Sequence, residues 1–134
     1  MADILRTENG GKLAFGDYTL DSKAKVNDFA ANGGVYSLRA YREITKLECN
    51  DSFVYESVPG TDVSGFLMKD ESVSFSVTGP EDAEITLGLE PEQEYDITLN
   101  GTDAGKMKTN LGGKLTISVE LEEGKTVSVE VKKA

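Results

Sequence analysis

The chain contains no histidine and no tryptophan, and it has one cysteine and three prolines among 134 residues. The absence of His excludes Ser-His-Asp and Cys-His nucleophilic sites, as well as HExxH zinc sites. With Cys49 alone, the chain can form neither an internal disulfide nor a cysteine-based zinc site. We expect Cys49 to pack as a small residue within a strand of a protein from a reducing compartment. The chemistry that remains is that of carboxylates, Tyr, Lys and Arg.

Long apolar runs are also missing. No stretch approaches the roughly 18 apolar residues of a membrane span, and residues 1–6 lack the basic start and apolar run of a secretion signal. These features predict a cytoplasmic protein that does not act in a membrane.

Positive charge is scarce, because 14 Lys and Arg face 24 Asp and Glu, for a net charge of -10. Residues 70–105 contain no Lys or Arg at all, and their acidic residues are Asp70, Glu71, Glu81, Asp82, Glu84, Glu90, Glu92, Glu94, Asp96 and Asp103. Such a segment repels phosphate, so we expect neither nucleic acid nor anionic membrane as a partner. Two interpretations remain: solvated positions that keep sheet edges unpaired, or a calcium site, although no spacing matches a defined calcium loop.

From residue 72 onward, apolar and polar residues alternate. Half-buried strands require this period of two, because successive side chains point to opposite faces of a sheet. Turn residues separate the strands, and Asn100-Gly101 and Glu122-Glu123-Gly124 each predict a hairpin. The apolar sets are Val73/Phe75/Val77, Ile85/Leu87/Leu89, Tyr95/Ile97/Leu99, Leu115/Ile117/Val119/Leu121 and Val127/Val129/Val131. The sequence therefore predicts an all-β fold, a single antiparallel β-sandwich domain over residues 1–134, jelly-roll or immunoglobulin-like, with at most one short helical turn.

Residues 1–67 are less regular than residues 68–134. Strands are expected at 35–41, 43–48 and 53–55, and Leu13/Phe15 and Tyr18/Leu20 suggest a strand pair around Gly16-Asp17. The helical turn is expected within 21–32, with Ser22 as cap, Val26, Phe29 and Ala30 on one side, and Gly33 as stop. Glycine pairs at 10–11, 33–34 and 112–113 precede strands and not helices, so they predict hairpin turns and no phosphate loop.

Two kinds of chemistry are compatible with this composition. Glycoside hydrolysis needs only two carboxyl groups at a set separation, and the chain has many candidate pairs. Binding of an anionic sugar needs a cation and a stacking surface, and Arg39 and Tyr41 fall on one face of an expected strand, opposite Leu38 and Ala40. We predict Arg39 and Tyr41 as ligand-binding residues, with ordinary sheet surface as the alternative, and we predict no catalytic and no metal-binding residue.

Three segments, FGDYTL (15–20), FVYESVPGT (53–61) and GKMKTNLGGKL (105–115), resemble short bacterial proteins that are labelled endosialidases. This resemblance implies cleavage of polysialic acid. The chain is nevertheless too short for the β-propeller of such enzymes and lacks the Trp of sialidase Asp boxes, so no catalytic residue is carried over. The strand 95–99, the Asn100-Gly101 turn and the strand 113–119 also resemble β-sandwich modules appended to polysaccharide lyases and glycosidases, which mostly support or bind.

Taken together, the sequence favours a non-enzymatic binding or assembly module whose partner is a glycan, a protein or further copies of itself. The alternative is a small carboxylate glycosidase or carbohydrate-binding module for anionic glycans. Calcium remains a possible cofactor, as a stabiliser of the scaffold.

Overall fold

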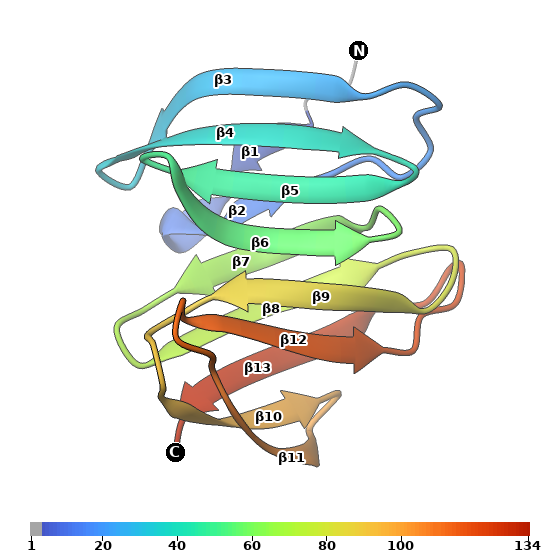
Figure 1. Cartoon of the computed structure of the whole chain (residues 1–134). Helices are drawn as coiled ribbons and strands as arrows, with labels where there is room; N and C mark the ends of the chain where they lie inside the picture. Colours follow the sequence, from blue (N-terminus) through green and yellow to red (C-terminus); the bar gives the residue numbers. More distant parts are fainter. Residues whose placement is uncertain (1–3) are drawn as a thin grey trace.

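The computed structural model describes residues 4–134, which form two antiparallel sheets packed face to face (Figure 1). Sheet A contains, in spatial order, β1 (Leu5–Thr7), β2 (Leu13–Phe15), β7 (Asp62–Met68), β8 (Ser72–Thr78), β13 (Val127–Lys133), β10 (Glu94–Leu99) and β11 (Thr102–Lys108). Sheet B contains β12 (Lys114–Val119), β9 (Ala83–Gly88), β6 (Ser52–Val58), β5 (Ile44–Cys49), β4 (Gly34–Tyr41) and β3 (Ala24–Ala31). The predicted antiparallel β-sandwich is confirmed, and the only helical segment of the described residues is the 3-10 turn η1 (Asn9–Gly11).

The dry faces of the two sheets meet in one apolar core. In β8, for example, Val73, Phe75 and Val77 are almost fully buried while the serines between them are not. An aromatic cluster joins the sheets, because Phe15 of sheet A contacts Tyr55 of sheet B edge to face, with ring centroids 5.2 Å apart. The alternation of the sequence therefore corresponds directly to the inner and outer faces of the sandwich.

A buried polar corner lies where the chain passes from β6 in sheet B to β7 in sheet A. The hydroxyl of Thr61 lies 2.8 Å from those of Tyr55 and Ser57. The hydroxyl of Thr45 accepts a hydrogen bond from the Thr61 N–H at 3.0 Å and donates one to the Thr61 carbonyl at 2.9 Å. All four residues are completely buried, so each hydroxyl depends on these partners for its hydrogen bonds.

The helical turn predicted within 21–32 is wrong, because these residues contain β3. The pairing of β3 with β4 shifts between Val26 and Phe29, and Asp28 has a positive φ of 59°. This bulge places two apolar residues three positions apart on the same face of a strand. A spacing of three is also that of a helix, which is why the sequence was ambiguous here.

Two predicted strand pairings are also wrong. Tyr18 and Leu20 lie in a loop, and β2 pairs instead with β1 and β7. The loop is fixed by its backbone, since the Tyr18 N–H donates to Asp62 and the Leu20 carbonyl accepts from Arg42 N–H. Residues Glu122-Glu123-Gly124 close no hairpin, because they lie in the crossover from β12 of sheet B to β13 of sheet A. Leu121, expected in the strand, lies just beyond the end of β12 and is buried there.

Three glycine pairs were expected to mark hairpins. The Gly33-Gly34 pair lies in the β3–β4 hairpin, and Gly10-Gly11 lies in η1 between the paired strands β1 and β2. The Gly112-Gly113 prediction is wrong, because the chain there crosses from β11 in sheet A to β12 in sheet B. Gly113 has a φ of 81°, and a Cβ at this position would lie 2.2 Å from the Leu89 carbonyl, so the crossover requires glycine.

Candidate functional site

The outer face of sheet B is where the structure places both predicted ligand-binding residues. Leu38 and Ala40 point into the core and are at most 1% exposed, whereas Arg39 lies on the outer face and is exposed. Tyr41 lies on the same face near the end of β4 and is half-buried. The two residues thus share a face, as their spacing predicts, but their surroundings differ.

Arg39 is the centre of a row of cations that crosses three strands. Lys25 of β3 lies directly opposite Arg39 of β4, and Arg39 lies directly opposite Lys46 of β5. Side chains opposite each other in antiparallel strands have Cβ atoms about 5 Å apart. We call Lys25, Arg39 and Lys46 the basic row. Sequence reasoning found only its central member, because the other two are adjacent to it only through strand register.

The basic row lacks ion-pair partners among residues 4–134. The salt bridges of this part of the chain involve Arg42, Lys106, Lys125 and Lys133, and none of them reaches the row. Glu56 of β6 lies directly opposite Lys46, and Glu48 lies diagonal to Arg39, although neither forms an ion pair with the row. Like charges directly opposite each other destabilise a sheet, whereas opposite charges stabilise it. Arg39, which has a cation directly opposite it on each side, is therefore the member of the row that is under repulsion.

Two hollows lie on this face of the sheet. The narrow hollow, of about 20 Å³ beside Arg39, is lined by Asn27, Ser37, Leu38, Arg39, Lys46 and Glu48. Asn27 and Ser37 also line a wider hollow of about 430 Å³, together with Asp28, Val35, Tyr36, Asn50 and Asp51. The β3 bulge includes Asn27 and Asp28, and hydrogen bonds with the Val35 backbone hold Asn50. Amide, hydroxyl and charged groups thus line both hollows.

Tyr41 lines neither hollow. The Lys23 ammonium lies over its ring, 5.7 Å from the centroid, so one face of the ring already has a cationic partner. A hydrogen bond with Glu43 raises the pKa of the Tyr41 hydroxyl. Arg39 thus lines the narrow hollow beside the basic row, whereas Tyr41 lies outside it.

A second concavity of about 610 Å³ lies at one end of the sandwich. It is lined by Asp82, Asn100, Glu120, Leu121, Glu122, Lys125, Thr126 and Val127. We call it the end groove. Two of its three carboxylates have partners within the chain: Asp82 accepts the Leu121 N–H at 3.0 Å, and Glu122 forms an ion pair with Lys125 at 3.0 Å.

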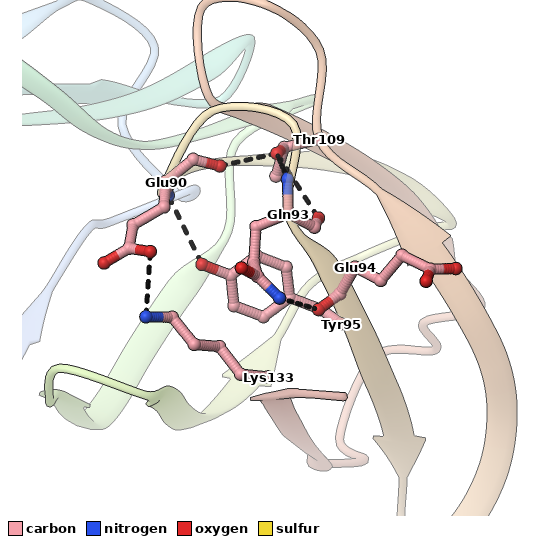
Figure 2. Close-up of polar contacts among 6 residues, drawn as sticks. All are labelled: Glu90, Gln93, Glu94, Tyr95, Thr109 and Lys133. Carbon is pink, nitrogen blue, oxygen red and sulfur yellow. Dashed lines mark hydrogen bonds and ion pairs between the residues drawn. The ribbon is translucent and has the colours of Figure 1, made fainter.

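The polar cluster of Figure 2 joins two crossovers between the sheets. Thr109 is central: its hydroxyl donates to the Glu90 carbonyl and accepts the Gln93 N–H at 2.9 Å. The Tyr95 hydroxyl accepts the Glu90 N–H, and the Glu90 carboxylate pairs with Lys133 at 2.8 Å, as Figure 2 shows. Because these groups bind one another, the cluster holds the β9–β10 and β11–β12 connections together.

Asp62 is a half-buried carboxyl group in a small pocket of about 120 Å³ on sheet A, which Arg6, Ser64 and Thr78 also line. Burial raises the pKa of Asp62 to about 6, the Tyr18 N–H opposes this shift, and Asp17 adds to it. In the described part of the chain, no three Asp, Glu or Cys side chains are grouped so that they could hold a metal ion.

Comparison of the chain with protein-family models, curated proteins and solved structures finds no match. Within residues 4–134, no helix is long and apolar enough to cross a membrane.

Proposed function

We propose that the protein is a non-enzymatic binding module that holds an anionic ligand on the outer face of sheet B, in the cytoplasm. The observation that carries this proposal is the basic row, in which Lys25, Arg39 and Lys46 lie side by side without ion-pair partners in the described chain. A bound anion would offset the repulsion within the row, so the electrostatic energy of the row favours binding of an anion.

Arg39 has the central role in this proposal. Its planar guanidinium can donate two parallel hydrogen bonds to one carboxylate or sulfate, whereas lysines act as point charges. Lys25 and Lys46, on either side, raise the local concentration of anions. The acidic remainder of the molecule disfavours nucleic acid and anionic membranes, which leaves smaller or more weakly charged anionic ligands.

Affinity electrophoresis in gels containing polygalacturonate or neutral dextran tests this proposal. We expect retardation by polygalacturonate and none by dextran, and Arg39→Gln should weaken binding at least tenfold, about 1.4 kcal/mol. Lys132→Gln is the matched control, because it removes one charge from β13 on sheet A. Equal losses in the two variants, or no retardation of the wild type in the polygalacturonate gel, would contradict the proposal.

A carboxylate glycosidase is the second candidate, and the end groove favours it because Asp82, Glu120 and Glu122 line one concavity. The candidate is weaker, because Asp82 and Glu122 already have partners within the chain. Release of reducing ends from acidic polysaccharides, abolished by Glu120→Gln but not by Arg39→Gln, would replace the binding proposal with this one.

A further inference from the structure

We infer that the ligand of the basic row is a linear acidic glycan whose chain runs across β3, β4 and β5, with its carboxylates against Lys25, Arg39 and Lys46. This inference rests on the proposed function and names the class and the orientation of the ligand. Its basis is the register of the three strands and the polar groups beside the row.

The direction of the row follows from the sheet. Neighbouring strands lie about 4.8 Å apart, so a row of directly opposed residues runs perpendicular to the strands and spans about 10 Å from Lys25 to Lys46. A linear acidic chain that crosses the strands along this row meets the three cations in turn.

The length of the binding surface is also set by the sheet. Lys25 lies on β3, which is the edge strand of sheet B, so no further strand of sheet B lies beyond it in residues 4–134. At the other end, Lys46 is followed by Glu56, which repels a carboxylate. The row therefore offers three consecutive cations, so we expect affinity to level off once a ligand is long enough to reach all three.

The groups beside Arg39 favour a glycan over a simple polyanion. Asn27, Ser37 and Glu48 line the narrow hollow next to it. An amide and a hydroxyl can donate to or accept from sugar hydroxyls, and Glu48 can accept a hydrogen bond from one. A polyanion without hydrogen-bond donors would be repelled by the Glu48 carboxylate. The position of Glu48 beside the row therefore favours a ligand that carries negative charge and also donor groups, such as the hydroxyls of an acidic sugar.

Calorimetric titration with galacturonate and its 1,4-linked oligomers from dimer to pentamer tests the inference. We expect affinity to rise at least tenfold from the monomer to the trimer and then to level off. Lys25→Gln and Lys46→Gln should each weaken trimer binding several-fold with little effect on the monomer, whereas Arg39→Gln weakens both. Glu48→Gln should weaken trimer binding but strengthen the binding of poly-glutamate.

The outcomes separate this inference from the proposed function. If the monomer and the trimer bind equally and Arg39→Gln binds neither, the anion site is supported, but the inference that a glycan chain runs across the three strands is wrong. If poly-glutamate of equal charge binds as tightly as the glycan, the glycan assignment is wrong. If Arg39→Gln binds every acidic ligand as well as the wild type, the proposed function itself fails. Unchanged circular dichroism spectra and melting temperatures within a few degrees establish that the variants are folded.

Discussion

At the scale of single residues, Asp62 is a carboxyl group whose proton is linked to folding. Burial raises its pKa from 3.8 to about 6. Because the folded-state pKa lies above the unfolded value, the stability that Asp62 contributes is complete below about pH 3.8 and is lost as pH rises through about 6. The ionised, partly desolvated carboxylate thus works against the fold at neutral pH.

Asp62→Asn removes this titration and keeps an oxygen that can accept the Tyr18 N–H. We expect the melting temperature of Asp62→Asn relative to wild type to be higher at about pH 7.5 than at about pH 4. Thermal denaturation of both proteins across this range measures the difference and cancels the effect of the other carboxylates. A difference that stays constant with pH would contradict the linkage.

Thr61 is the centre of the buried polar corner, and its hydroxyl satisfies both Tyr55 and Ser57. Thr61→Val keeps the shape of the side chain but leaves these two buried hydroxyls without that partner. We expect a loss of about 2 kcal/mol in the free energy of unfolding, measured by urea denaturation. Ser64→Ala, on the exposed outer face of sheet A, is the control and should change stability by less than about 0.5 kcal/mol. An equally small loss in Thr61→Val would mean that the corner is not held by its hydroxyls.

The sequence predicted some residue positions and not others. Arg39 could be assigned to the face of its strand that is opposite to the face of Leu38 and Ala40. This assignment needs only the alternation of side chains along one strand, and not the identity of the neighbouring strands. Lys25 and Lys46 could not be added to the site, since their proximity depends on which strands pair and in what register. Asp62 carried no signal either, because its burial comes from a loop that only the folded chain brings to it.

At the scale of elements, we expect the cations of the β3–β4–β5 meander to favour anion binding and to lower the stability of the fold. Arg39 stands between two lysines of like charge. Arg39→Gln should therefore raise the free energy of unfolding by about 0.5 kcal/mol while it weakens anion binding. Urea denaturation at low and high salt measures this, and the gain should shrink at high salt because ions screen exposed charges. A variant that loses stability in low salt would show that the row is not under repulsion.

The elements that sequence analysis missed are those whose signal was altered by tertiary context. The β3 bulge gave a strand the residue spacing of a helix. All seven residues of β11 are exposed, so this strand lacks the alternation of apolar and polar residues that marks a half-buried strand. The Asn-Gly dipeptide at 100–101 correctly predicted a hairpin, and the structure shows that it connects the paired strands β10 and β11. Glu122-Glu123-Gly124 has similar turn chemistry, yet it connects different sheets, and local sequence does not distinguish the two cases.

At the scale of the whole molecule, the sandwich followed from alternation and size, whereas the assignment of strands to sheets did not. Strands β8, β9, β10, β12 and β13 share one pattern but are divided between sheets A and B. The same division determines where charge gathers. The acidic excess of residues 70–105 is spread over several loops and both sheets, while the basic row is concentrated on one face.

The proposed function requires that the ligand bind on the outer face of sheet B. Titration of ¹⁵N-labelled protein with trigalacturonate, followed by amide chemical shifts, shows where the ligand binds. We predict shifts concentrated in β3, β4 and β5, around Lys25, Arg39, Lys46 and the neighbouring Asn27 and Ser37. Shifts confined to the end groove around Glu120 and Lys125, or no shifts at saturating ligand, would contradict it.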